Sequence, residues 1–167
     1  MEVNEKIVEE YIKLVKNWFY MTDLSVSVVR GYSNIDLLAY DPKNNNYYDM
    51  EIKYRSAAKV SRSNDDEMDK YFKQMTRKER KQTIEKIIGN DKNIIKVFIT
   101  TRNFFDKNGI IETKFIEKMQ KNKYKCEIWY FDDIVPKLYE YVDKKGKYNT
   151  ELTQTIRLIK TYINNRL

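Results

Sequence analysis

The chain has 167 residues, which suits one domain with a sizeable hydrophobic core. Hydrophobic residues make up 41% of it, which excludes a disordered chain, and 32 basic against 25 acidic side chains give a net charge of +7. This charge favours an anionic partner, most commonly nucleic acid, although a Lys-rich and Asn-rich composition can also reflect a bias in how the gene is written.

Two gaps in the composition restrict the chemistry. The sequence contains no histidine, which excludes histidine-based triads, histidine general bases and histidine zinc sites. Its one cysteine, Cys126, excludes an intrachain disulfide and a cysteine-cluster metal site, and its apolar surroundings predict a core position. Any metal must therefore be held by oxygen ligands, which points to magnesium, manganese or calcium.

Targeting signals are not visible. The first five residues are acidic and amphipathic, unlike a signal peptide, and no apolar run approaches the roughly 20 residues that a membrane span needs. We therefore expect a cytoplasmic protein without a membrane partner.

The first third of the chain predicts one helix and three strands. Apolar residues at three- and four-residue spacing predict a helix over Val3–Tyr20. Gly31 and the Pro- and Asn-rich segment 41–46 are turn signals, so the second and third strands form a hairpin. The predicted strands are Leu24–Arg30, Ile35–Tyr40 and Tyr47–Arg55.

The rest of the chain alternates helices and strands after an irregular segment, 56–64. The predicted elements are a helix over Asp65–Ile88 ended by Gly89-Asn90, a strand buried on both faces over Ile94–Thr100, a helix over Ile111–Gln120, a strand over Cys126–Tyr130, a helix opened by Asp132-Asp133 and, beyond Gly146, a helix over Thr150–Ile163. This order predicts one α/β domain over 1–167, a mixed central sheet with helices on both faces. Its core spans about 1–131, and 132–167 forms a C-terminal helical extension.

Charged side chains occupy one face of the predicted third strand. Strand side chains alternate, so Glu51, Lys53 and Arg55 share a face while Met50 and Ile52 share the other. A carboxylate followed by two cations on one face indicates either a catalytic or metal-binding site or a solvent-exposed strand face.

The second strand contributes Asp36, a carboxylate in an apolar run that is costly to bury without a charged partner. Neighbouring strands lie roughly 4.8 Å apart, so Asp36 and Glu51 are expected to share a divalent cation, with the Ile52 carbonyl as a further ligand. Such a metal polarises a phosphate and lowers the pKa of its bound water. Lys53 would orient that water or stabilise charge on the phosphate.

The motif Ile35-Asp36, then fourteen residues, then Glu51-Ile52-Lys53 resembles the PD-(D/E)XK signature of restriction-endonuclease-like enzymes. The surrounding stretch looks most like archaeal Holliday junction resolvases and Mrr-type endonucleases, although Ile35 stands where the eponymous proline would be. The resemblance covers about the first 55 residues by motif and 1–131 by order of elements. It implies an αβββαβ core, an acidic pair that binds Mg²⁺ (with Mn²⁺ as a substitute) and a lysine that assists phosphodiester hydrolysis.

The resemblance implies further site residues. Many members place a glutamate from the first helix near the metal, and Glu10, at the edge of the apolar helix face, is preferred here over Glu9. Ser33 matches a serine of the junction resolvases, but a serine there also serves a turn. Arg55 and Arg30 are expected to meet DNA phosphates, with a salt bridge as the alternative for Arg55.

The basic residues after the motif form either a flank that contacts phosphates or a solvent-exposed helix with salt bridges. The acidic residues interspersed among them favour the exposed helix. The basic residues are Lys59, Arg62, Lys70, Lys73, Arg77, Lys78, Arg80 and Lys81. The last helix carries an apolar stripe that either caps the core or pairs with a partner chain, and a homodimer suits an enzyme that cuts both strands. The stripe consists of Leu152, Ile156, Ile159 and Ile163.

These patterns predict a magnesium-dependent deoxyribonuclease of a restriction, repair or recombination type, with DNA preferred over RNA by the resemblance. One alternative is a nuclease-fold module that binds nucleic acid without cutting it. Another is an interaction protein whose positive charge is purely compositional.

Overall fold

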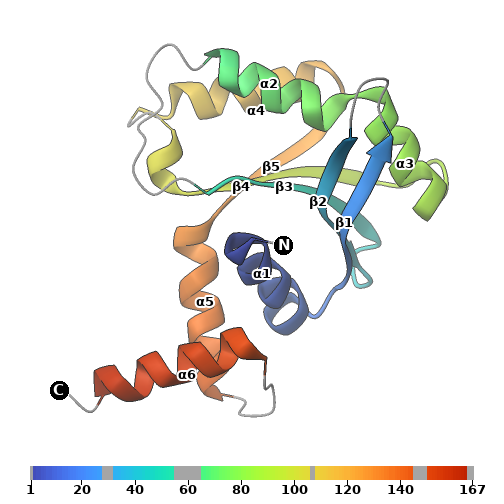
Figure 1. The fold of residues 1–167 in the computed structure, drawn as a ribbon. Helices are drawn as coiled ribbons and strands as arrows, with labels where there is room; N and C mark the ends of the chain where they lie inside the picture. Colours follow the sequence, from blue (N-terminus) through green and yellow to red (C-terminus); the bar gives the residue numbers. More distant parts are fainter. Residues whose placement is uncertain (1, 28–31, 55–64, 106–107, 145–149, 165–167) are drawn as a thin grey trace.

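A five-stranded mixed sheet forms the centre of the computed structural model (Figure 1). The structure describes residues 2–27, 32–54, 65–105, 108–144 and 150–164. The strands are β1 (Phe19–Ser27), β2 (Tyr32–Asp41), β3 (Asn46–Ile52), β4 (Ile94–Thr100) and β5 (Lys125–Tyr130), and they lie side by side in chain order. β1, β2 and β3 pair antiparallel, whereas β3, β4 and β5 pair parallel through helical crossovers.

Helices cover both faces of this sheet. They are α1 (Val3–Glu10), the π-helix η1 (Tyr11–Lys16), α2 (Asp65–Thr76), α3 (Lys78–Ile88), the short 3₁₀-helix η3 (Arg102–Phe104), α4 (Ile110–Lys121), α5 (Phe131–Lys144) and α6 (Glu151–Asn164). α1 and α5 lie on one face and α2, α3 and α4 on the other (Figure 1). The predicted α/β class, with a mixed sheet between helices, is confirmed.

The first helix is shorter than predicted. The α-helix ends at Glu10 and continues as the π-helix η1 to Lys16, and the left-handed backbone of Asn17 (φ 56°) turns the chain into β1. The prediction that it continues to Tyr20 was wrong, because Phe19 and Tyr20 pair with Tyr40 and Ala39 in the sheet. An apolar segment between a helix and a strand can form its backbone hydrogen bonds either by extending the helix or by extending the strand. Helical spacing of its apolar residues alone does not decide between the two.

The predicted long helix after the motif is two helices. Arg77 has an extended backbone (φ −62°, ψ 147°) and separates α2 from α3. α2 packs Met68, Tyr71 and Met75 into the cluster around β4, whereas α3 buries Ile84 against β1 and β2. One straight helix cannot follow both surfaces, so the chain bends where they diverge.

The third strand ends at Ile52 rather than Arg55, although the Lys53 amide still donates to the carbonyl of Ile99 on β4 at 2.8 Å. Several predicted features lie outside the described residues, so the structure does not describe them. These are Arg30, Gly31, Arg55, the irregular segment 56–64 and the division at Gly146.

Strand β4 joins the two halves of the core, as its continuous apolar pattern predicted. Val97 and Ile99 belong to the cluster under α1 and α5, and Phe98 to the aromatic cluster under α2 and α4. Cys126 packs against the latter cluster, where burial raises the pKa of its thiol to about 12. Cys126 is only half-buried at the edge of this cluster, so its predicted core position holds in part.

The last helix uses only part of its apolar stripe. Leu152 and Ile156 pack against the cluster of Leu14, Leu138 and Val142, whereas Ile159 and Ile163 are exposed. None of the described helices is long and apolar enough to cross a membrane.

This division of α6 predicts unequal effects from two matched truncations. Ile156→Ala removes packing against α5 and η1 and is expected to lower the free energy of unfolding by about 1–2 kcal/mol. Leu158→Ala, at a side chain that is 71% exposed, is expected to change it by less than about 0.5 kcal/mol. Urea denaturation of both variants measures this, and equal losses would show that α6 does not dock as described.

Candidate functional site

Asp36 and Glu51 face each other across the β2–β3 pair. Leu37 pairs with Met50, so the next opposite position places Asp36 beside Glu51 on the same face of the sheet. The Asp36 carboxylate accepts the backbone N–H of Ile52 at 2.7 Å and so takes the place of a backbone acceptor at the end of the ladder. The structure therefore brings together the two carboxylates that the sequence predicted to be neighbours.

Lys53 lies between these carboxylates. Its Nζ is 2.9 Å from Glu51 Oε1 and 3.5 Å from Asp36 Oδ2, and 32% of the side chain is exposed. Burial lowers the pKa of Lys53, but Glu51 and Asp36 outweigh it and hold this pKa above its ordinary value. Lys53 is therefore a charged donor at neutral pH.

The carboxylates of Asp36 and Glu51 repel each other. Burial, and then the charge of Glu51, raise the pKa of Asp36 to about 6 despite the opposing effects of Lys53 and the Ile52 amide. Additional positive charge at this position would relieve the repulsion.

A buried ion network that sequence reasoning missed lies directly behind the pair. Arg80 donates to Asp49 Oδ1 at 2.6 Å and to Glu51 Oε2 at 2.8 Å, and Lys96 Nζ lies 2.5 Å from Asp49 Oδ2. Burial alone raises the pKa of Asp49, but Arg80 and Lys96 lower it to about 2. All four side chains are almost completely buried.

The placement of Arg80 in a solvated or phosphate-contacting helix was wrong, because its side chain is only 1% exposed. Two other members of the network, Asp49 and Lys96, are indicated by the sequence. Asp49 shares the Glu51 face by strand alternation, and Lys96 is a lone cation in an apolar strand, aligned with Asp49 in the parallel register. The sequence around Arg80 itself carries no signal, because its burial follows from how α3 docks.

Glu51 is bonded on both oxygens. Oε1 accepts from Lys53 and from Gln74 Nε2 at 2.8 Å, and Oε2 accepts from Arg80. The connected groups comprise three carboxylates and three cations, and so balance in charge: Asp36, Asp49, Glu51, Lys53, Arg80 and Lys96.

The oxygen ligands fit a hard divalent cation bound by two carboxylates. Asp36 Oδ1 has no hydrogen-bond partner among the described residues. Glu51 Oε1 accepts from both Lys53 and Gln74, so a metal would have to displace Lys53 from this oxygen. The Ile52 carbonyl points to the same side of β3 as its N–H, toward Asp36. In the described part of the chain no third acidic or cysteine side chain completes a cluster, so water and a phosphate oxygen would fill the other positions.

Asp36 opens to solvent through a cavity of about 400 Å³ lined by Ser33, Asn34, Gln74 and Arg77. Ser33 lines this cavity together with Asp36, and its predicted contact with nucleic acid stays a prediction. Arg77, at the break between α2 and α3, adds a cation there.

The helix glutamates lie elsewhere. Glu10 is buried beside a groove between α1 and the start of α6, and its Oε2 has no hydrogen-bond partner within the described chain. Glu9 accepts the hydroxyl of Tyr20 at 2.9 Å. Among the described residues, neither joins Asp36 and Glu51 in a three-carboxylate cluster, so the structure does not bring together the auxiliary acid and the pair.

Comparisons with known proteins leave the family open. No family model matches the chain, and no curated protein is similar to it. Among solved structures, it is similar to the crystal structure of a protein of unknown function, AF1548, with 12% identity and a TM-score of 0.41. The match covers 74% of this chain and 58% of that one, so the chain spans less than two thirds of its length.

The raised pKa of Asp36 predicts that Asp36→Asn increases the free energy of unfolding by an amount that depends on pH. Its pKa is 3.8 in the unfolded chain and about 6 in the folded one, so the folded protein binds more protons in this window and Asp36 destabilises it increasingly as the pH rises. In metal-free buffer the variant should match the parent near pH 4 and exceed it by about 1–3 kcal/mol at neutral pH. Thermal denaturation across this range tests it; a variant less stable throughout would contradict the stated pKa.

The ion network predicts that Arg80→Met causes a large loss of stability. This change leaves Asp49 and Glu51 buried without the guanidinium, and should lower the free energy of unfolding by about 3–5 kcal/mol. Lys81→Met, at the neighbouring exposed position, is the control and should change it by less than about 0.5 kcal/mol. Chemical denaturation distinguishes the two, and similar small effects would contradict the network.

Proposed function

We propose that this protein is a metal-dependent endonuclease that hydrolyses phosphodiester bonds in DNA. The observation that carries the proposal is the convergence of Asp36, Glu51 and Lys53 at the end of β3, beside a solvent-accessible opening. Asp36, Glu51 and the Ile52 carbonyl would hold Mg²⁺, or Mn²⁺ in its place. The fold supports this assignment only at the level of a mixed α/β sheet.

A bound Mg²⁺ supplies Lewis-acid polarisation of the phosphate and a lowered pKa of its bound water. The chain's own contribution is positional. Glu51 and Asp36 hold the pKa of Lys53 above its ordinary value in the metal-free chain, so Lys53 is poised there as a hydrogen-bond donor. It would stabilise charge on the phosphate or orient the attacking water, while Gln74 and Arg80 hold Glu51 in its rotamer.

DNA as the substrate rests on the net charge of +7 and on the resemblance to Holliday junction resolvases and Mrr-type endonucleases. Arg77 and Ser33 in the lining of the cavity suit a contact with the phosphate backbone. A role in restriction, repair or recombination follows from the same resemblance.

A specific observation favours a second candidate, a nuclease-fold module that binds nucleic acid without cutting it. Glu51 already has partners on both oxygens, and the surrounding ion network is neutral without a metal. Such a site would serve stability and leave salt-dependent DNA binding as the function.

Cleavage assays test the first candidate. Purified protein with Mg²⁺ or Mn²⁺ is expected to cut at least one of several DNA forms, namely duplex, flap and four-way junction. Asp36→Ala should abolish cleavage, because it removes a metal ligand, and Lys53→Ala should slow it by about 10²–10³-fold. Asp69→Asn is the control, because this carboxylate pairs with Lys118 away from the site.

Calorimetry separates the two candidates. An active site predicts Mn²⁺ binding that Asp36→Ala abolishes and Asp69→Asn preserves. The binding module predicts salt-dependent DNA affinity without such metal binding, and cleavage unaffected by both active-site substitutions would overturn the assignment.

A further inference from the structure

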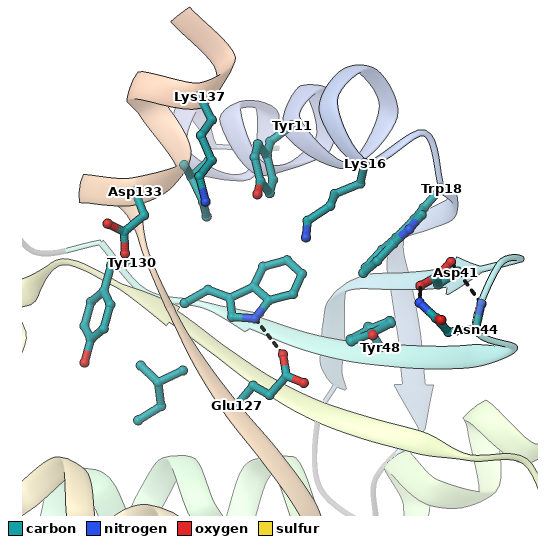
Figure 2. A pocket seen from close by; sticks show the side chains of 13 residues that line it. Tyr11, Lys16, Trp18, Asp41, Asn44, Tyr48, Glu127, Tyr130, Asp133 and Lys137 are labelled. Carbon is teal, nitrogen blue, oxygen red and sulfur yellow. Dashed lines mark hydrogen bonds between the residues drawn. The ribbon is translucent and has the colours of Figure 1, made fainter. Parts of the chain in front are cut away.

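A second cavity lies on the opposite face of the sheet, between η1, α5 and strands β3 and β5 (Figure 2). Its volume, about 340 Å³, falls within the range of small-molecule sites, about 300–1,000 Å³. Aromatic rings form much of the wall. Trp18 stacks on Tyr48 with ring centroids 4.4 Å apart. The ring centroid of Trp129 lies within 6.3 Å of the ring centroids of Tyr48, Trp18 and Tyr11.

The π-helix η1 shapes this cavity. Tyr11 and Lys16 are five positions apart, which in an α-helix separates side chains by about 140° around the axis. The wider π-helical turn brings residues five apart onto one side, and Lys16 Nζ lies 5.8 Å from the Tyr11 ring centre. An unusual helix geometry thus aims both side chains into one site.

Two ammonium groups face the cavity. Lys16 Nζ lies 5.1 Å and 5.2 Å from the ring centres of Trp18 and Trp129, and Lys137 reaches in from α5 (Figure 2). Burial, and then the charge of Lys137, lower the pKa of Lys16 and outweigh the opposing effects of Glu127 and Asp41. Within the described chain neither lysine forms an ion pair. Two facing cations on an aromatic wall attract an anion that carries a flat ring.

The three acidic residues that line the cavity differ in whether a carboxylate oxygen is left to accept a hydrogen bond from a ligand. Asp133 is paired with Arg102 at 2.7 Å, and Asp41 accepts from the amide of Lys43 at 2.9 Å and from Asn44. Glu127 accepts the indole N–H of Trp129 at 2.8 Å through Oε2, and its Oε1 has no hydrogen-bond partner among the described residues. One carboxylate oxygen therefore remains to accept a hydrogen bond from a ligand N–H beside the indole.

We propose that this cavity binds a nucleotide, with its phosphate between Lys16 and Lys137 and its base against the indoles of Trp18 and Trp129. Aromatic faces stack on any base, lysines pair with phosphate, and Glu127 accepts a base N–H. The same chemistry is offered by a free mononucleotide and by the phosphorylated end of a single strand. The site lies across the sheet from Asp36 and does not depend on cleavage.

Intrinsic fluorescence tests the proposal directly, because the sequence has two tryptophans and both line this cavity. Deoxyadenosine 5′-monophosphate is expected to quench tryptophan emission saturably. Deoxyadenosine and inorganic phosphate, each half of the ligand, should bind at least roughly tenfold more weakly. A short 5′-phosphorylated oligodeoxyadenylate that binds more tightly than the mononucleotide identifies a single strand as the source, and tighter mononucleotide binding identifies the free nucleotide.

Matched variants separate this site from the catalytic proposal. Lys137→Gln, at an exposed residue of α5, should weaken nucleotide binding roughly tenfold, whereas Lys121→Gln on α4 and Asp36→Ala should leave it unchanged. Absence of saturable quenching by either nucleotide probe up to about 10 mM would overturn the proposal. Phosphate alone binding as tightly as the mononucleotide, or affinity unchanged by Lys137→Gln, would overturn it as well.

Discussion

The buried contact of Arg80 with Asp49 and Glu51 is the constraint on which the rest of this structure depends. Strand alternation places two carboxylates on the same face of β3, and burying them without a cation would cost several kcal/mol each. Arg80 and Lys96 supply the charges, so α3 has to dock where its arginine reaches β3. The bend at Arg77, which separates α3 from α2, follows from the same requirement.

This network also determines what the candidate site can do. Arg80 holds one oxygen of Glu51 and Gln74 contacts the other, so the carboxylate is oriented before any ligand arrives. Preorganisation of this kind suits catalysis, because a metal ligand held in one rotamer loses little entropy on binding. The neutral balance of the six charged groups suits a purely structural role equally well, and the occupancy of Asp36 by a metal is the property that separates the two.

The two faces of the sheet differ in chemistry. The face under α2 and α3 carries the ionic layer, and the face under η1 and α5 carries the aromatic wall with Lys16 and Lys137. Alternation along β3 produces both, since Asp49 and Glu51 point one way while Tyr48 points the other. A single seven-residue strand thus contributes to both proposed sites.

Local patterns in the sequence predicted most of the sheet and the proximity of Asp36, Glu51 and Lys53. Period-two alternation and the turn residues of segment 41–46 are local properties, and a hairpin leaves the register of its two strands little freedom. The burial of β4 could also be predicted, because a seven-residue strand with five apolar residues has few other places to lie.

Only the tertiary structure decided which partners these residues meet. The end of the helical segment at Lys16 depends on whether Phe19 and Tyr20 gain more from the sheet than from a further helical turn. The burial of Arg80 and the position of Glu10 depend on how helices dock on faces that their own sequences do not describe. Such contacts join residues about 30 positions apart, as Arg80 and Asp49 are, and their energies arise only when the whole chain is packed.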